Sequence, residues 1–390
     1  MSISFEKLET PCYVINKEKL ESSINCFVKA IEEVYPETIL AYSYKTNYYP
    51  YIVNHMKSRG IYAEVASEEE YHLATKGIGY ANHIIYNGPV KSKETFLEAI
   101  KNGCIVNIDS YREIRWLEEL ELSKIYKVGI RINFDMAKYY PEETQLVAIS
   151  SRFGFCMHNE ELRHVISIIK RMKHIEINCL HIHCGANSRS LAIYECITER
   201  ACEVIRDYDL SIEYIDIGGG FKLGVNEELT MHNYLLTIKE CLKRNKLEGI
   251  KLILEPGNSM VYPAIDYITT VIDVKKTERD CFVILDGSRI HTEPLFRGRQ
   301  YHIQINRKSD REKIVDNQYL VGSTCKESDR FWKLKNTNEV LEGDKVIFEQ
   351  VGAYTMSLAP TFILTFPNVY VFSDKGYTLY AKKKGYTEMM

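Results

Sequence analysis

The chain has 390 residues, of which 45% are hydrophobic and 26% charged, and its formal net charge is -3. This balance gives no electrostatic reason to expect nucleic acid or an anionic membrane as a partner, and no apolar run reaches the roughly 18 residues of a membrane-spanning helix. Because the N-terminus lacks the pattern of a signal peptide and the eleven cysteines form an odd set without CxxC spacing, we expect a reduced, cytoplasmic protein.

The first predicted elements are a short strand at residues 12–15 and a helix over residues 17–35. Apolar side chains recur at helical spacing along this helix, and Asn16 is a suitable N-cap for it. A similar apolar stripe over residues 162–169 follows Asn159 and predicts a further helix of the same kind.

Eight short apolar runs, rich in β-branched and aromatic residues, follow one another along the next part of the chain. They are residues 39–45, 61–67, 83–89, 104–110, 127–134, 179–185, 214–220 and 251–257. Near-continuous apolar runs separated by helical patterns are typical of parallel strands covered by helices on both faces. Eight such units in about 240 residues predict an α/β fold of the closed (β/α)8 type, a TIM barrel, with an open doubly wound sheet as the alternative.

After Pro263, the alternation of apolar runs with helical patterns stops. Seven further runs, with little helical periodicity between them, cover residues 268–274, 282–287, 301–306, 318–323, 345–354, 368–373 and 376–381. They predict an antiparallel β domain that also takes the N-terminal strand. The expected domains are therefore a barrel at residues 17–263 and a β-sandwich or β-barrel formed by residues 1–16 and 264–390.

Three features with chemical potential lie at the ends of predicted barrel strands. Lys45 ends the first strand, and Gly218, Gly219 and Gly220 follow the seventh. Glycine amides can approach an anion closely, and barrels often bind phosphate after strands seven and eight; the alternative is a tight strand-to-helix turn. Glu255 ends the eighth strand, where it would face a cationic ring nitrogen or serve as a buried structural carboxylate.

His181 and His183 lie on one face of the sixth predicted strand, because side chains alternate along a strand. The HxH pattern suggests a metal site, but core packing and an imidazole stacked on a flat cofactor are the competing interpretations. No third and fourth ligand follows at a suitable spacing, so we predict no metal.

Lys45 alone is ambiguous, because a lysine at a strand end can simply extend into solvent. Together with a phosphate-type loop and a carboxylate at the same rim, it matches what pyridoxal phosphate requires. That cofactor needs a lysine to form an imine, a phosphate cradle and a partner for its pyridine nitrogen.

The chain resembles the fold-type III pyridoxal-phosphate decarboxylases, which include diaminopimelate, ornithine and arginine decarboxylases and share an alanine-racemase-like barrel. Nine segments carry the resemblance in the expected order: YSYKTN, EVASEEE, GIRINF, SRFGF, LHIHCG, DIGGGF, EPG, GSTC and GAYT.

The resemblance implies a role for several residues of this chain. Lys45 becomes the Schiff-base lysine, His183 stacks on the pyridine ring, and Glu255 faces the ring nitrogen. The residues implied near the cofactor are Glu64, Ser67, Glu70, Arg131, Gly218, Gly219, Gly220 and, as a phosphate ligand, Tyr354. Cys325 becomes the catalytic cysteine, which in this family crosses a dimer interface into the partner's site, so a homodimer is expected.

The chain departs from the family where the substrate is recognised. Asn258 follows EPG where an arginine is usual, Ala186 replaces a serine, and DGSRIHTEPLF lacks the arginine that clamps a distal carboxylate. Lys326 follows the cysteine where the family has an acidic residue. The expected substrate-binding candidates are Lys326, Glu327, Asp329 and Arg297.

These observations predict an amino-acid decarboxylase whose substrate, whether an L-, D-, meso or conjugated amino acid, the sequence does not name. An amino-acid racemase is the alternative within the same fold, although racemases normally place an arginine at the pyridine nitrogen. A non-catalytic decarboxylase homologue that binds partners is a second alternative. A metal-dependent barrel hydrolase that uses His181 and His183 is a third.

Overall fold

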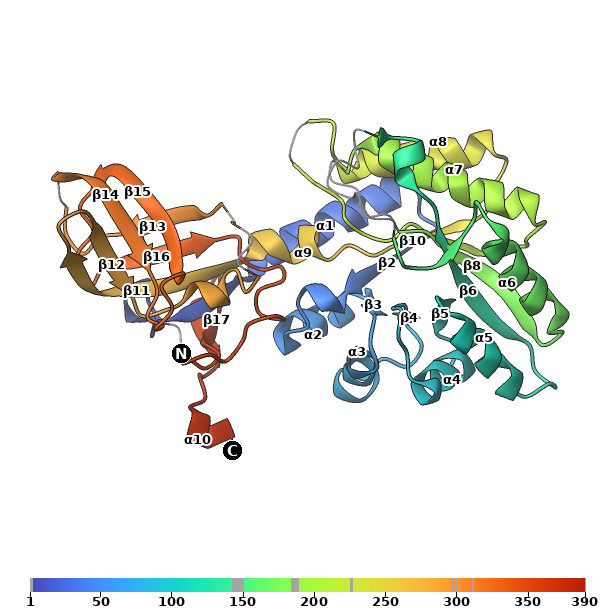
Figure 1. Cartoon of the computed structure of the whole chain (residues 1–390), viewed down its shortest axis with the longest axis horizontal. Coiled ribbons are helices and arrows are strands. Elements are labelled where there is room, and N and C mark those ends of the chain that lie inside the picture. The colour runs from blue at the N-terminus through green and yellow to red at the C-terminus, as the bar shows by residue number, and fades with distance from the viewer. Residues whose placement is uncertain are drawn as a thin grey trace. The chain divides into compact units, whose positions relative to one another are not determined.

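The computed structural model describes residues 3–141, 151–183, 189–224, 227–295, 298, 300–310 and 312–389, and these fall into two units (Figure 1). One unit is Asn25–Ser259, and the other combines Met1–Ile24 with Met260–Met390. Each unit is built around its own nine-stranded sheet.

The larger unit is a closed barrel of parallel strands. Its eight strands are β2 (Thr38–Ser43), β3 (Tyr62–Val65), β4 (Ile84–Tyr86), β5 (Ile105–Ile108), β6 (Tyr126–Asn133), β8 (Ile175–His181), β9 (Tyr214–Asp216) and β10 (Lys251–Leu254). Each pairs in parallel with the next, and β10 pairs with β2, so the sheet closes on itself. The short β7 (Phe155–Cys156) adds to β6. The predicted (β/α)8 barrel is confirmed, and the open doubly wound sheet is excluded.

Helices cover the outside of the barrel strands (Figure 1). They are α1 (Lys17–Val34), α2 (Pro50–Ser58), α3 (Glu68–His72), α4 (Lys93–Lys101), α5 (Tyr111–Trp116), α6 (Glu160–Arg171), α7 (Leu191–Asp207) and α8 (Met231–Arg244). The two predicted N-caps accept hydrogen bonds as expected, Asn16 from the amide of Lys19 at 2.9 Å and Asn159 from that of Glu161 at 2.9 Å. Within the described ranges, no helix combines the length and the apolar character needed to span a membrane.

The interior of the barrel is packed with side chains. Ala41, Ile85, Cys179 and Ile253, from four different strands, form one buried cluster. A barrel with such a filled interior is a core and not a pore, which leaves the strand ends and their loops as the place for chemistry.

The second unit is a mostly antiparallel sheet. Its strands are β1 (Cys12–Asn16), β11 (Ile265–Lys276), β12 (Cys281–Leu285), β13 (His302–Asn306), β14 (Ile314–Val321), β15 (Arg330–Asn338), β16 (Lys345–Glu349), β17 (Asn368–Ser373) and β18 (Gly376–Ala381). The N-terminal β1 joins this sheet, as predicted, and it pairs antiparallel with β11 and parallel with β17. The sequence did not predict β15, because this edge strand, which pairs with β14, is largely polar. The short helix α9 (Asn258–Val261) spans the division between the two units, and α10 (Tyr386–Met389) lies in the second unit.

Candidate active site

The carboxyl ends of the barrel strands carry the candidate residues of the larger unit. Lys45 lies in the turn Tyr44–Thr46 directly after β2, Glu64 lies within β3, and Glu255 directly follows β10. Because all eight strands run in the same direction, their carboxyl ends meet at one rim, which is where TIM-barrel enzymes place their active sites.

Lys45 and Glu64 form an ion pair at this rim. The ammonium donates to Glu64 Oε2, which also accepts a hydrogen bond from the hydroxyl of Ser43. The Glu64 side chain is 1% exposed, whereas that of Lys45 is 47% exposed. Burial alone would raise the pKa of Glu64, but the charge and hydrogen bond of Lys45, with the hydrogen bonds from Ser43 and Asn87, outweigh it and lower the pKa. The lysine is thus held by a buried carboxylate, while about half of its side chain stays exposed.

A buried polar network connects this pair to Glu255. Asn87 follows β4, and its amide donates to Glu64 Oε1 at 3.2 Å and to Glu255 Oε1 at 2.6 Å. Its oxygen accepts from the amide of Asn107 at 2.8 Å, and Asn107 also donates to Asp216 at 3.2 Å. Sequence reasoning missed Asn87, Asn107 and Asp216, because each is a single polar residue in or beside an apolar strand.

Glu255 is a buried carboxyl group with an unusual charge environment. It is 5% exposed, and His181 Nε2 lies 3.9 Å from its Oε2 atom. Burial, followed by the neighbouring carboxyl groups of Asp216 and Glu64, raises the pKa of Glu255 well above its ordinary value. A cation beside this group would stabilise its ionised form.

The two histidines of the HxH pattern occupy different positions. His181 ends β8, is 2% exposed, and has no hydrogen-bond partner for either ring nitrogen among the described residues. The Nδ1 atom of His183 accepts from the amide of Gly219 at 3.3 Å. Burial and the nearby cations lower the pKa of His183 to about 3 and that of His181 well below its ordinary value, so both rings are neutral. His181, Asp216 and Glu255 have potential ligand atoms within 4.8 Å of one another, a group that does not include His183.

The three glycines after β9 make a turn into which side chains would not fit. Gly218 and Gly220 have φ values of 73° and 93°, in the region that favours glycine. A Cβ atom at Gly219 would lie 2.1 Å from the carbonyl oxygen of Glu255, and one at Gly220 would lie 2.6 Å from the guanidinium of Arg189. The turn is therefore one that only glycine fits, because atoms of the chain itself lie against it, and the guanidinium of Arg189 lies beside Gly220. Sequence reasoning also missed Arg189, which no motif marks.

Arg131, Ser67 and Glu70 have local structural partners. Arg131 donates to Asp109 at 3.2 Å and lies 4.7 Å from the ring centroid of Phe153. Ser67 and Glu70 form a capping box at the start of α3: Ser67 accepts from the amide of Glu70 at 3.2 Å, and Glu70 from that of Ala66 at 2.7 Å. These contacts give each segment a defined shape at the rim.

In the second unit, Asp329 organises the loop that carries Cys325. Its carboxylate is 2% exposed and accepts from the hydroxyls of Ser288 at 2.9 Å and Thr324 at 2.6 Å, and from the amides of Arg289 at 2.9 Å and Thr324 at 3.2 Å. These donors give Asp329 a structural role in this loop, and its contact with a substrate ammonium stays a prediction. Cys325 itself is exposed.

The other candidates of this unit are surface residues. Glu327 is almost fully exposed and accepts from Arg330 at 3.2 Å, and Lys326 contributes its carbonyl to the same loop. Tyr354 has a φ of 56°, a strained value that often marks a functional position, and it lines a pocket of about 480 Å³ with Thr292, Glu293, Pro294, Leu295, Gly298, Ala353 and Leu358. Arg297 and Ala186 lie outside the described residues.

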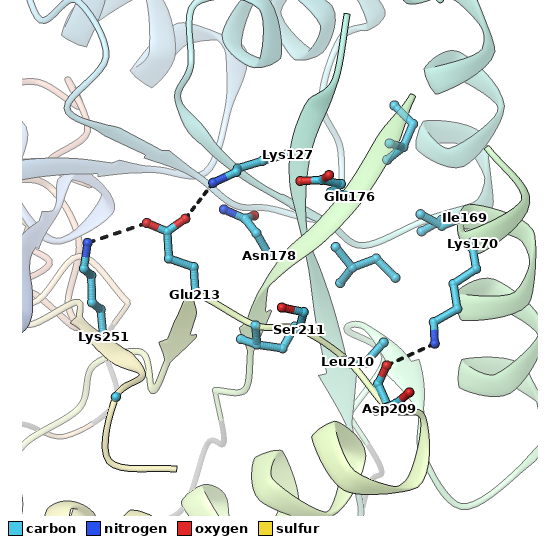
Figure 2. A pocket seen from close by; sticks show the side chains of 14 residues that line it. Lys127, Ile169, Lys170, Glu176, Asn178, Asp209, Leu210, Ser211, Glu213 and Lys251 are labelled. Atoms are coloured by element: carbon cyan, nitrogen blue, oxygen red, sulfur yellow. Dashed lines mark hydrogen bonds and ion pairs between the residues drawn. The ribbon is translucent and has the colours of Figure 1, made fainter. Parts of the chain in front are cut away.

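A larger pocket of about 650 Å³ lies at the opposite, amino end of the barrel strands (Figure 2). Glu213 points between Lys127 and Lys251 there, at 2.9 Å and 3.6 Å, and Lys170 donates to the carbonyl of Asp209 at 3.2 Å. The charges of Glu213 and its lysines are mutually satisfied, and this end of a barrel usually serves stability. Size alone therefore does not mark the active site.

The rim fits pyridoxal phosphate on three counts. Lys45 offers an amine that is held by Glu64, on a side chain that is about half exposed. Glu255 offers a buried carboxyl group whose ionisation would favour a cationic ring nitrogen beside it. The glycine turn places the guanidinium of Arg189 beside Gly220, and this cation suits a phosphate.

Comparison with known proteins also indicates a pyridoxal-phosphate site. The family model described as the pyridoxal binding domain of pyridoxal-dependent decarboxylases matches residues 21–262. The diaminopimelate decarboxylase of Methanocaldococcus jannaschii is 27% identical over 99% of this chain and 91% of that protein, and that of Aquifex aeolicus is 26% identical over 90% and 83%. The crystal structure of the M. jannaschii enzyme has a TM-score of 0.86 at 26% identity, covering 98% of this chain and 92% of that one, and a second structure of it contains L-lysine.

The family match covers more than half of the chain and includes the strands that form the rim. It confirms the resemblance that the nine sequence segments indicated, together with the cofactor that the resemblance implied. The chain belongs to the pyridoxal-dependent decarboxylases and is a pyridoxal-phosphate-dependent carboxy-lyase of amino acids.

Proposed function

We propose that the barrel rim decarboxylates its amino-acid substrate with Lys45 as the residue that holds the cofactor. The observation that carries the proposal is the buried network in which Asn87 joins the Lys45–Glu64 ion pair to Glu255. One end of this network presents an amine, and the other presents a carboxyl group. When bound between them, pyridoxal phosphate accepts the electron pair that remains after the bond from Cα to the carboxylate breaks.

Each residue of the rim then has a stated task. Lys45 Nζ would hold the cofactor by condensing with its aldehyde carbon as the aldehyde oxygen leaves in water, and Glu64 would keep that nitrogen in place. Glu255 keeps the ring nitrogen protonated: two unit charges about 4 Å apart interact by about 4 kcal/mol at an effective dielectric near 20. The amides of Gly218 and Gly219 donate to Asp216 and His183, so the phosphate would be bound by the last glycine of the turn, Gly220, with the guanidinium of Arg189 beside it. The neutral ring of His183 would support the flat ring of the cofactor.

Proton return completes the reaction. After carbon dioxide leaves, Cα must receive a proton, and we assign its delivery to Cys325 Sγ and Lys45 Nζ. Tyr354 is assigned to the phosphate. Glu255 argues against racemisation, because a racemase of this fold normally places an arginine at the ring nitrogen, where it keeps the ring uncharged.

The substrate is the open part of the proposal. The similar proteins are named diaminopimelate decarboxylases, and one was crystallised with L-lysine. In this chain Lys326 follows Cys325, and an ammonium at that position would repel a distal ammonium of the substrate. We therefore expect the preferred substrate to differ from that of the named relatives.

A screen for carbon dioxide release tests the proposal. The purified protein with pyridoxal phosphate should release carbon dioxide from one or a few members of a panel of L-, D- and meso-amino acids. The Lys45→Ala variant should release none. Inversion of an amino acid without carbon dioxide would indicate the racemase, and bound cofactor without turnover on any panel member would indicate a non-catalytic homologue.

We also propose that the working form is a homodimer in which the partner subunit's Cys325 completes each site. A mixture of Lys45→Ala and Cys325→Ala subunits tests this arrangement. Random reassociation makes half of the dimers mixed, each with one intact site, so activity should return to roughly a quarter of wild type. No recovery on mixing would contradict the shared site, while leaving the assignment of Lys45 untouched.

A further inference from the structure

A second lysine of the barrel, Lys91, is buried near the carboxyl ends of β4 and β5. It lies in the loop between β4 and α4, and it is paired with Glu113 on α5. Both side chains are 0% exposed. Charged side chains are rarely buried so completely, because their removal from water is costly. The tasks assigned above to the rim residues do not account for this buried pair.

The hydrogen bonds of Lys91 show that its buried amine is an ammonium. The Nζ atom donates to the carbonyl oxygens of Gly88 at 2.8 Å and Asn107 at 2.9 Å, and to Glu113 Oε1 at 3.2 Å. Three acceptors match the three N–H groups of an ammonium, whereas a neutral amine has two. Burial lowers the pKa of Lys91, and the charge of Glu113 opposes that shift.

The two carbonyl groups that the ammonium holds belong to the backbone of the rim network. Gly88 directly follows Asn87, whose side-chain amide donates to Glu64 and Glu255. Asn107 is itself a member of the network, because its side-chain amide donates to Asn87 at 2.8 Å. The ammonium therefore connects the two backbone segments that carry both asparagine side chains.

Glu113 fixes the chain on the other side of Asn107. Its Oε2 atom accepts from the backbone amide of Asp109, the residue directly after β5, at 2.8 Å. The Asp109 carboxylate in turn accepts from Arg131 at 3.2 Å and from the amide of Gly154 at 2.9 Å. The buried pair thus joins the loop after β4 to the chain within and directly after β5.

The asparagine amides of the network depend on a fixed backbone. Asn87 must direct its two N–H groups to Glu64 and Glu255, and its oxygen to Asn107. Hydrogen bonds weaken steeply when their distance or angle departs from the preferred range. A displacement of the backbone at Gly88 or Asn107 would therefore weaken the contacts that orient both carboxyl groups.

We propose that Lys91 and Glu113 are positioning residues for the cofactor. They fix the backbone that carries Asn87 and Asn107, so that the two amides hold the carboxyl groups of the rim in the orientation that pyridoxal phosphate requires. The inference rests on the proposed function for the tasks of those carboxyl groups, and it adds a pair that acts through Asn87. Neither Lys91 nor Glu113 need touch cofactor or substrate.

Neutral replacements separate positioning from a merely structural role. Lys91→Met leaves Glu113 buried without its cation and should lower both stability and cofactor affinity. Lys91→Met combined with Glu113→Gln removes both charges at similar volume, and such a replacement is often neutral for stability. This double variant should unfold close to the wild-type temperature and still bind pyridoxal phosphate about tenfold more weakly, because the two carbonyl contacts of Lys91 are lost. Recovery of both stability and affinity would overturn the proposal.

Two further variants complete this comparison. Lys93→Met is the matched control, because Lys93 forms a half-exposed ion pair with Glu119 at 2.9 Å, and it should bind pyridoxal phosphate as wild type does. If the neutral variants do not fold, Glu113→Asp keeps both charges but shortens the side chain, and it should weaken cofactor binding by about threefold or more. An unchanged affinity in Glu113→Asp would then contradict the proposal.

A double-mutant cycle tests whether the pair acts through Asn87. Asn87→Ala alone should weaken the binding of pyridoxal phosphate by about tenfold, because it removes hydrogen bonds to two carboxyl groups. Added to the Lys91→Met, Glu113→Gln background, it should cause little further loss, because residues in one hydrogen-bond network are not additive. A combined loss equal to the product of the separate losses would show that the pair does not act through Asn87.

Nuclear magnetic resonance of the cofactor-free protein, labelled with nitrogen-15 at asparagine, gives a readout that needs no cofactor. The side-chain amide signal of Asn87 is the one absent from Asn87→Ala. Its protons should exchange with solvent at least about tenfold faster in the Lys91→Met, Glu113→Gln variant than in wild type or Lys93→Met. Equal exchange rates would overturn the proposal. If the wild type binds no pyridoxal phosphate, the proposed function fails, and these exchange rates still decide whether the pair holds Asn87.

Discussion

Each end of the barrel holds a glutamate among charged groups, and the surroundings shift the pKa values of the two glutamates in opposite directions. At the amino end, Glu213 lies between Lys127 and Lys251; burial would raise its pKa, but its hydrogen bonds and the two lysines outweigh burial and lower it. At the carboxyl end, Glu255 has no lysine or arginine partner in the described part of the chain, and burial raises its pKa.

This difference in charge pairing shows that the amino end of the barrel serves stability and the carboxyl end serves binding and catalysis. The amino end neutralises its charge with its own side chains, so nothing further is gained there by binding a cation. The carboxyl end buries Glu64, Asp216 and Glu255 and pairs only the first of them with a lysine in the described structure. This imbalance costs folding free energy, and a bound cationic ring would relieve it.

The largest contrast between the two ends is expected for their lysines. Lys45→Ala should lower turnover by at least about a thousandfold, because it removes the group that attaches the cofactor. Lys251→Ala, the matched change at the amino end, should leave turnover near wild type. Steady-state kinetics of the two variants measure this contrast. A similar loss of turnover in both variants would contradict it.

A smaller contrast is expected for the glutamates. Glu255→Gln should lower kcat by up to about a thousandfold, because an interaction of about 4 kcal/mol with the ring nitrogen is lost and each 1.36 kcal/mol corresponds to tenfold. Glu213→Gln should leave kcat unchanged. An unchanged kcat for Glu255→Gln would show that its charge does not act on the reaction.

The smallest effect concerns stability at the amino end. Because the folded-state pKa of Glu213 is lowered, its contribution is present above the unfolded pKa near 4.3 and is lost as the pH falls through the folded value. Solvent screens this partly exposed pair, so Glu213→Gln should cost no more than about 1 kcal/mol at pH 7. Thermal unfolding of wild type and Glu213→Gln at pH 7 and below pH 4 should show that the difference in stability between them becomes smaller in acid. A difference in stability that becomes larger in acid would contradict the lowered pKa of Glu213.

The strands and the rim motifs could be predicted from the sequence, because both depend on local pattern. Apolar runs at regular spacing gave the barrel, and strand ends placed Lys45, Glu255 and the glycines on one rim. The β15 strand was missed, since an edge strand exposed to solvent need not be apolar.

The buried network could not be predicted, because its contacts join residues far apart in the chain. Asn87 and Glu255 are separated by 168 positions, and an isolated asparagine after an apolar strand carries no signal of its partner. Asp329 likewise looked like a substrate contact from its position after Cys325, whereas its donors include Ser288 and Arg289, about 40 positions earlier. Local sequence indicates which residues are polar, and tertiary packing decides what they bind.

Reduction of the loaded enzyme with borohydride is the most direct test of the central claim, because it fixes pyridoxal phosphate permanently to the lysine that holds it. Peptide mass spectrometry should then find the label on Lys45. Lys91 is a useful comparison, since its ammonium is fully buried and paired with Glu113 at 3.2 Å. Label on Lys45 is the predicted result, and label on Lys91 or any other lysine with Lys45 unmodified would contradict the account.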